Sequence, residues 1–206
     1  MLKTISFLMV FIFAPMGLAQ TVPGVSFGVG SLGATLEAGL RLGPGLGLRG
    51  IAGYGSGDFS QDYNGAPLAG TATIGGYGVL ADIYLGGGTR FSAGAIVPKY
   101  SADIAISGDL TLNGTLISNI DIVGRIDSIR PYAPVFAFGY EKSFGRSWGL
   151  SADLGAIYTG GFALVASDNS GQIPQADLDA ELASTNTRLG NITFLPFVKL
   201  GVSFGF

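Results

Sequence analysis

The chain has 206 residues, of which 48% are hydrophobic and only 12% are charged, and 35 of them are Gly. This composition is apolar and Gly-rich for a soluble domain of this size. The absence of Cys and His excludes disulfide frameworks, Cys/His zinc sites and the most common general base. A formal net charge of −3 argues against nucleic acid as a partner, because no cationic stripe is present to neutralise phosphates.

The N-terminus has the order of segments found in secretory signal peptides. Lys3 precedes an apolar run over residues 5–14, and Pro15 and the small-residue site Gly17-Leu18-Ala19 follow it. The run is about half of the roughly 20 residues that a membrane-spanning helix needs. We therefore predict a signal peptide at residues 1–19 and one exported domain at residues 20–206.

Apolar residues then alternate with small or charged ones. In the last predicted strand Val198, Leu200, Val202 and Phe204 alternate with Lys199, Gly or Ser, and residues 34–42 and 148–159 alternate in the same way. Alternate residues of a strand face opposite sides. Small soluble barrels fill their interiors with large hydrophobic side chains, so a charged minor face favours a barrel with lipid outside and a polar interior.

The predicted fold is all-β: an eight-stranded antiparallel up-and-down transmembrane β-barrel. Tight turns at 43–45, 86–88 and 144–146 alternate with longer links at 60–71, 104–126 and 164–191, as expected for periplasmic turns and extracellular loops. The short outer turn at Ser31-Leu32 does not fit this alternation. The strands are predicted at 22–30, 33–43, 46–59, 72–86, 89–103, 127–143, 147–163 and 192–206.

Aromatic residues fall near both ends of these strands. Such a distribution is typical of two interfacial girdles, although strands are enriched in aromatics in general. Phe91, Trp148, Phe204 and Phe206 lie near the tight turns, and Tyr54, Tyr132, Tyr158 and Phe194 lie near the long links.

Eight charged residues fall on the predicted inward faces. We predict that they meet in the lumen, with Asp153 and Lys199 as cross-strand partners. Two interpretations remain open: a plugged lumen of compensated ions, or a narrow charged path that selects small charged or zwitterionic solutes. The set is Glu37, Arg41, Arg49, Asp82, Arg90, Glu141, Asp153 and Lys199, in which Glu37 and Arg49 flank one tight turn and Asp82 and Arg90 flank another.

Other motifs indicate little chemistry. Residues 28–33 and 45–50 match G-x-G-x-x-G, but residues 34–42 alternate like a strand where a dinucleotide site needs a helix. Without a Ser-His pair or paired carboxylates beside a base, we predict no catalysis, no cofactor and no metal site. Pro174 and the acidic segment 175–183 predict either a short helix in the last outer loop, folded over the barrel mouth, or a solvated acidic loop.

Two segments carry a family resemblance. Residues 129–140 (IRPYAPVFAFGY) and 148–160 (WGLSADLGAIYTG) resemble stretches of small Gram-negative outer-membrane barrels related to CarO, the ornithine-uptake porin type. Residues 80–84 and 90–94 around a Gly turn, the acidic loop at 177–181 and the ending at 196–206 add to the resemblance. It implies eight strands and a role in passing basic amino acids, and it carries over no ligand residues.

These observations together predict an exported, monomeric barrel surrounded by outer-membrane lipid. Phe206 ends the last strand and resembles the signal read by the barrel-assembly machinery. The expected function is structural or that of a narrow passive channel for small, amino-acid-like solutes. The alternative is a barrel that displays the loops 104–126 and 164–191 to an extracellular partner without transport, and a third hypothesis is a soluble periplasmic barrel.

Overall fold

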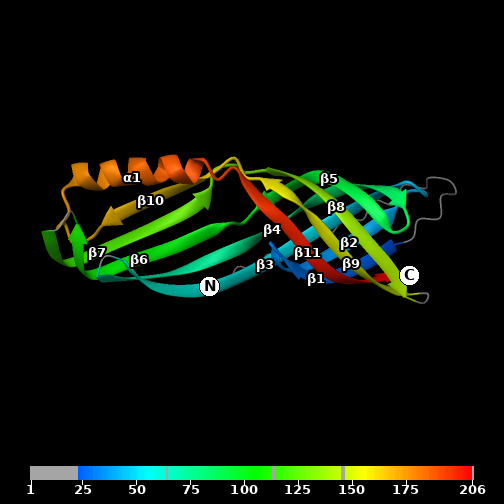
Figure 1. Ribbon diagram of the computed structural model, residues 1–206, viewed down its shortest axis with the longest axis horizontal. Coiled ribbons are helices and arrows are strands. Elements are labelled where there is room, and N and C mark those ends of the chain that lie inside the picture. Colours follow the sequence, from blue (N-terminus) through cyan, green and yellow to red (C-terminus); the bar gives the residue numbers. More distant parts are fainter. Residues whose placement is uncertain (1–22, 64, 113–114, 145–146, 206) are drawn as a thin grey trace, which may run out of the picture.

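The computed structural model describes residues 23–205 except 64, 113–114 and 145–146, so the predicted signal peptide and Phe206 lie outside the described residues. Its sheet closes into a ring, because the first strand pairs with both the second and the last, and the strand that begins at Ala66 pairs with the one that begins at Thr89. This confirms the predicted all-β barrel of eight antiparallel strands (Figure 1). They are β1 (Pro23–Gly30), β2 (Gly33–Arg41), β3 (Leu46–Tyr63), β4 (Ala66–Gly86), β5 (Thr89–Pro98), β8 (Ala133–Phe144), β9 (Trp148–Tyr158) and β11 (Phe194–Gly205).

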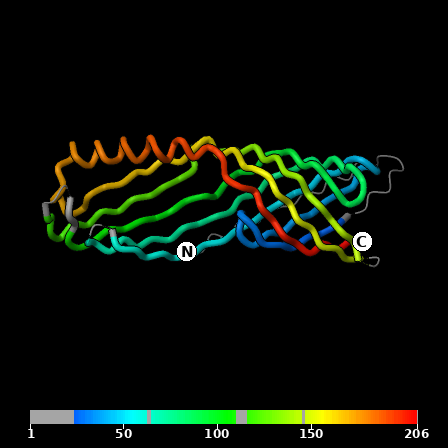
Figure 2. Tube along the Cα trace, in the orientation of Figure 1, coloured from blue at the N-terminus to red at the C-terminus, as the bar shows by residue number. Residues whose placement is uncertain are grey.

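The three links predicted as long loops are folded, which corrects the sequence analysis. Residues 60–71 extend β3 and β4 into a long hairpin, and residues 104–126 lie mostly in β6 (Ser101–Leu112) and β7 (Thr115–Ser128). Residues 164–191 contain the end of β10 (Phe162–Asp168) and helix α1 (Gln175–Gly190). The segments of β3 and β4 that continue beyond the barrel (within residues 55–74), together with β6, β7, β10 and α1, form a second part of the molecule, which we call the extension. It lies at the left of Figures 1 and 2.

The polarity of the two sheet faces inverts where the barrel passes into the extension. On β3 the outer face carries Leu46, Leu48 and Tyr54 within the barrel, and then Ser56 and Asp58 beyond it. The inner face changes in the opposite direction. In the barrel it carries charged residues such as Arg49, whereas in the extension it carries half-buried apolar residues: Phe59, Leu68, Ile104, Ile106, Ile122 and Ile126. The barrel is thus apolar outside, and the extension has the polar outer face of a sheet in water.

Helix α1 covers one edge of the extension sheet. It is longer than the short helix considered from the sequence, and it lies along β10 rather than over the barrel mouth (Figure 1). The Asn186 side chain accepts a hydrogen bond from the Leu164 N–H (2.6 Å) and donates one to the Leu164 carbonyl (2.9 Å), so it replaces a neighbouring strand. No helix in the described residues is long and apolar enough to cross a bilayer.

A loop held by Asp168 leads from β10 into α1. Its carboxylate accepts hydrogen bonds from the Ser170 N–H and hydroxyl and from the Ile173 N–H (2.9, 2.5 and 2.9 Å). Partial burial acts to raise the pKa of Asp168, but these hydrogen bonds outweigh it and lower that pKa below its usual range. The loop places Ile173 against Ala66 and Ile120, where the extension has a small apolar core of its own.

The short turn between β1 and β2, unexplained from the sequence, has a structural role. Leu32 is 1% exposed and packs in the apolar core inside the barrel. The Ser31 N–H donates to the Val198 carbonyl (2.9 Å), which fixes the turn against β11. Gly33 follows at φ +80°, in the left-handed region that favours glycine. The turn is therefore short because it folds into the barrel mouth.

The closest approach of β8 and β9 requires a glycine at position 155. A Cβ on Gly155 would lie 1.9 Å from the Phe136 carbonyl oxygen, whereas a Cβ on Gly57 would meet nothing within 4 Å. Gly155→Ala should therefore lower the free energy of unfolding by about 1–3 kcal/mol through overpacking. Gly57→Ala is the matched control. Urea unfolding of the refolded protein, followed by fluorescence of Trp148, measures both, and equal midpoints would contradict this close approach.

Candidate functional site

An ion network fills the half of the barrel interior nearest the tight turns, and Arg49 lies at its centre. Its guanidinium binds Asp82 through two nitrogens, Nε and Nη2, at 3.1 Å each. The same group donates to Glu37 at 3.0 Å, Asp153 at 3.3 Å and Ser92 at 3.0 Å. Since Arg49 is on β3 and Asp153 is on β9, these bonds join walls of the barrel that are not neighbours in the ring.

Asp153 is the second centre of the network. Arg90 donates to both of its carboxylate oxygens at 2.8 and 3.0 Å, and Lys199 lies 3.2 Å away. Lys199 also pairs with Glu37, and Arg90 reaches Glu141 at 3.3 Å. A Cβ on Gly139 would lie 2.4 Å from Asp153 Oδ1, so the Arg90–Asp153 pair needs a glycine on β8.

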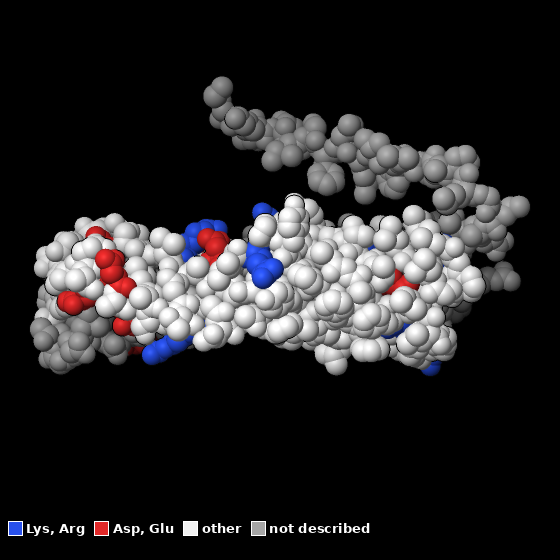
Figure 3. Space-filling view, turned by 90° about the horizontal axis from the view of Figure 1, so that it is seen from above, with Lys and Arg blue, Asp and Glu red and all other residues white. Residues whose placement is uncertain are grey.

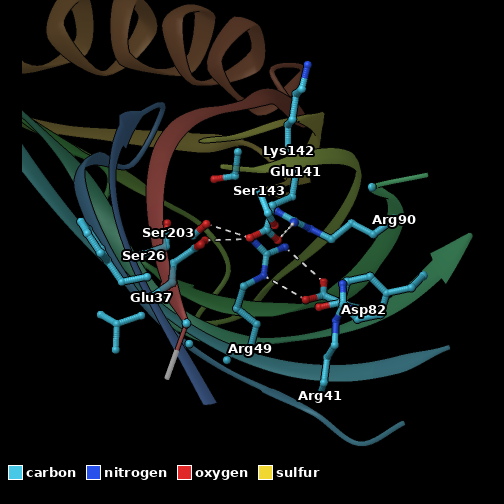
Figure 4. Close-up of a pocket in the computed structure, with 18 of the residues that line it drawn as sticks. Ser26, Glu37, Arg41, Arg49, Asp82, Arg90, Glu141, Lys142, Ser143 and Ser203 are labelled. Atoms are coloured by element: carbon cyan, nitrogen blue, oxygen red, sulfur yellow. Dashed lines mark hydrogen bonds and ion pairs between the residues drawn. The ribbon is translucent and has the colours of Figure 1, made fainter. Parts of the chain in front are cut away.

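The structure therefore brings together seven of the eight charged residues predicted to meet inside the barrel. Arg41 is the exception, because it is exposed and lies over the Tyr84 ring, 4.0 Å from its centroid. The predicted Asp82–Arg90 relation is also replaced: Asp82 pairs with Arg49, and Arg90 pairs with Asp153 and Glu141. The seven are Glu37, Arg49, Asp82, Arg90, Glu141, Asp153 and Lys199 (Figure 4 shows five of them).

A cavity of about 580 Å³ lies between this network and the tight turns. Glu37, Arg49 and Asp82 line its inner end, and Arg41, Tyr84 and Trp148 belong to its wall. Glu141 is the most accessible carboxylate of the network, with 29% of its side chain exposed. Figure 4 shows the Lys142 side chain pointing away from the cluster. The cavity therefore gives water access to the network from the turn end.

The other half of the interior is apolar, which corrects the expectation of a polar lumen throughout. Side chains of Ile51, Leu80, Ile96, Ile157 and Phe197 lie between the network and the extension, and none is more than 3% exposed. Side chains that bordered an open water path would be exposed to it. The apolar layer and the ion network therefore close the lumen between them in this conformation.

Sequence reasoning missed the hydroxyl groups of the site. Ser92 donates to Asp82 at 2.6 Å, and Ser203 donates to Glu141 at 2.7 Å. Ser92 lies two residues after Arg90 and Ser203 lies four after Lys199, so the same period-two pattern that selected the charges contained the signal for both. The buried hydroxyls of Ser26 and Ser151 have no hydrogen-bond partner among the described protein atoms.

The chemistry of this arrangement is charge compensation. Three buried cations, Arg49, Arg90 and Lys199, face three buried carboxylates, and every member has at least one partner of opposite sign. No group of three or more His, Cys, Asp or Glu residues in the described part of the chain is arranged to hold a metal ion. Compensated ions of this kind join the walls of a barrel, at the cost of removing each charge from water.

Comparison with known proteins identifies the fold. The chain superimposes on the crystal structure of CarO2 from Acinetobacter baumannii with a TM-score of 0.65 and 22% sequence identity, covering 91% of this chain and 100% of that one. CarO from the same organism gives a TM-score of 0.62 and 21% identity, covering 90% and 98%. The fold is that of CarO, as the resemblance predicted. No family model matches the chain, and no curated protein sequence does.

Removing one ion should show what the network contributes. Lys199→Met leaves Glu37 and Asp153 buried with one cation fewer, and we expect it to cost about 3–5 kcal/mol of unfolding free energy. Arg41→Met is the matched control, because among the described residues it removes an exposed cation that stacks on the Tyr84 ring, a contact worth about 0.5–1 kcal/mol.

Urea unfolding in detergent measures both variants, together with the double variant Glu37→Gln/Lys199→Met. The double variant should recover part of the loss, because it also removes a carboxylate that Lys199 compensates. A loss for Lys199→Met no greater than that for Arg41→Met would contradict the buried network.

Proposed function

We propose that the protein resides in the bacterial outer membrane, where a sealed barrel anchors the folded extension outside the bilayer. The outer face of the barrel supports a lipid environment, because its exposed side chains are large and apolar. On the face seen in Figure 3, very few charged atoms lie over the barrel half of the molecule. Contiguous exposed apolar surface of this extent marks contact with a membrane or a partner. Examples are Phe27, Leu36, Val79, Phe138, Leu154 and Leu200, each at least 49% exposed.

The spacing of the outward-facing aromatics fits a bilayer. On β9, Trp148 and Tyr158 mark the two ends of the apolar belt, ten residues apart. Ten residues of strand span about 33 Å, and a tilt of roughly 40° reduces this to about 25 Å, the height of the apolar band in outer-membrane barrels. Phe204 lies at the Trp148 end, and Tyr54, Tyr132 and Phe194 are exposed at the other. Tight turns on the periplasmic side would then place the extension outside the cell.

The closed lumen is the observation that carries the anchoring role. An eight-stranded barrel is only wide enough for its own side chains, and here an ion layer and an apolar layer both fill it. A narrow passive channel for small, amino-acid-like solutes is the second candidate, and the cavity at the turn end, which charged side chains of the network line, favours it. Such a channel would require Phe197 and its apolar neighbours to move aside.

Conductance in planar bilayers distinguishes the two candidates. With a sealed lumen we expect no unitary conductance, and proteoliposomes should swell in small amino acids no faster than protein-free vesicles. A wide, open porin in the same lipids is the positive control, and heat-modifiable migration on gels shows that the barrel is folded. Steady solute flux would overturn the sealed-anchor proposal. If Asp153→Asn/Lys199→Met then abolished that flux, the charged layer would be the selective path.

Membrane assembly is tested at the C-terminus. A chain that ends at Gly205 lacks the terminal aromatic residue, which we propose is read by the barrel-assembly machinery. The shortened chain should reach the outer membrane in much lower amounts, while its refolded form in detergent keeps nearly the same unfolding midpoint. Phe206→Tyr, which retains an aromatic end, is the matched control. Normal insertion of the shortened chain would count against the outer-membrane assignment.

A further inference from the structure

The two edges of the extension sheet differ. At one edge, α1 and the side chain of Asn186 cover β10. At the other edge, β3 pairs with β2 only as far as Tyr54, and from Ser56 to Asp62 its ladder partner among the described residues is β4 alone. Unpaired edges of a sheet readily accept another strand, and proteins usually block them. The extension therefore keeps one strand edge open.

The register shows which backbone groups this edge offers. The Tyr84 N–H donates to the Gly45 carbonyl, so odd-numbered residues of β3 direct their backbone groups toward β4. Even-numbered residues direct theirs to the opposite side, as the Leu46 carbonyl does when it accepts from Leu42. Beyond β2, the outward N–H and C=O groups belong to Ser56, Asp58, Ser60 and Asp62, which are all exposed.

The extension as a whole is strongly acidic, and Asp58 and Asp62 lie on the open edge itself. Ten of the 14 acidic residues of the chain lie in the extension, against two basic ones, Arg125 and Arg188. Figure 3 shows acidic side chains gathered at the extension end. The acidic residues are Asp58, Asp62, Asp103, Asp109, Asp121, Asp127, Asp168, Asp177, Asp179 and Glu181. A field of this sign attracts cations and repels a second copy of the same edge.

We propose that the free edge of β3 binds an extended cationic segment of another protein as an added strand. This inference rests on the proposed display of the extension outside the cell. Asp58 and Asp62 lie on the polar face four residues apart, so two Lys or Arg side chains at the same spacing would lie opposite them. Phe59 points to the other face, where an apolar side chain of the ligand would pack. An antiparallel ligand would run from a cation opposite Asp62 to a cation opposite Asp58, with an apolar residue opposite Phe59. The recognised pattern is therefore cation, any residue, any residue, apolar residue, cation.

A second copy of this chain is a poorer occupant. Two β3 edges could pair antiparallel with Ser60 of one copy opposite Ser60 of the other. Asp58 of each copy would then lie directly opposite Asp62 of its partner. Like charges directly opposite each other destabilise a strand pair. A cationic ligand reverses the sign of both contacts, and its backbone still forms the same ladder of hydrogen bonds.

The test is binding of a labelled, end-blocked heptapeptide, Thr-Lys-Thr-Thr-Val-Lys-Thr, to the refolded protein in a zwitterionic detergent. Fluorescence anisotropy should show saturable binding. Ser60→Pro should abolish it, because proline lacks the outward N–H and its ring blocks the edge. The N–H of residue 60 has no part in the β3–β4 ladder, so the fold should tolerate the change. Ser60→Ala is the matched control and should bind as the unmodified protein does.

Charge selection is tested separately from the edge. Asp58→Asn/Asp62→Asn should weaken binding at least tenfold, since amides keep the hydrogen-bond acceptors but remove the charges. A peptide with Glu at both Lys positions should not bind, and added salt should weaken binding of the cationic peptide.

No binding by the unmodified protein, or equal binding by Ser60→Pro and Ser60→Ala, would overturn the proposal. Equal binding by the double Asn variant would refute its charge rule. Binding in detergent is independent of flux and membrane insertion, so failure here is distinguishable from failure of the anchoring role.

Discussion

Charge compensation inside a narrow ring is the constraint on which the barrel depends. With apolar side chains turned outward, the polar half of each alternating strand must lie inside. Eight strands enclose only enough space for those side chains, so every buried ion needs a partner within reach. Arg49 meets this condition by binding Asp82 on the adjacent strand and Asp153 across the lumen. The network thus balances charge and joins opposite walls in one set of contacts.

The apolar layer strengthens this arrangement. Phe197 and Leu80 separate the ions from the extension, so among the described residues the turn-end cavity is the side from which water can reach the network. Electrostatic attraction grows as water is excluded. The interior is therefore graded along its axis, from the partly exposed Glu141 near the turns, through the buried pairs of Asp153, to the apolar side chains beneath the extension.

The alternation of apolar residues with small or charged ones predicted most of the barrel. A charged residue between outward-facing apolar residues of a strand marks an inward position. This pattern selected all seven network residues, with Arg41 in addition, and it predicted the Asp153–Lys199 pair, but it did not predict the partners of Arg90. The partner of Arg90 depends on which strands become neighbours when the ring closes, and this is a non-local property. The apolar layer was missed because Ile51 and Leu80 share the inward phase with Arg49 and Asp82, and in the sequence they look like irregularities of the pattern.

The extension was predicted as loops for a related reason. Residues 101–107 and 120–127 alternate much as the barrel strands do, but with their polar members outward, and Ile104 or Ile122 beside Asp103 or Asp121 does not reveal which face meets water. The inversion along β3 and β4 resolves this ambiguity. Both strands are continuous through it, and their register is unbroken from Leu46 to Tyr63. The change from lipid to water that the proposed membrane location implies would account for the inversion, because the same backbone ladder must present opposite faces to each.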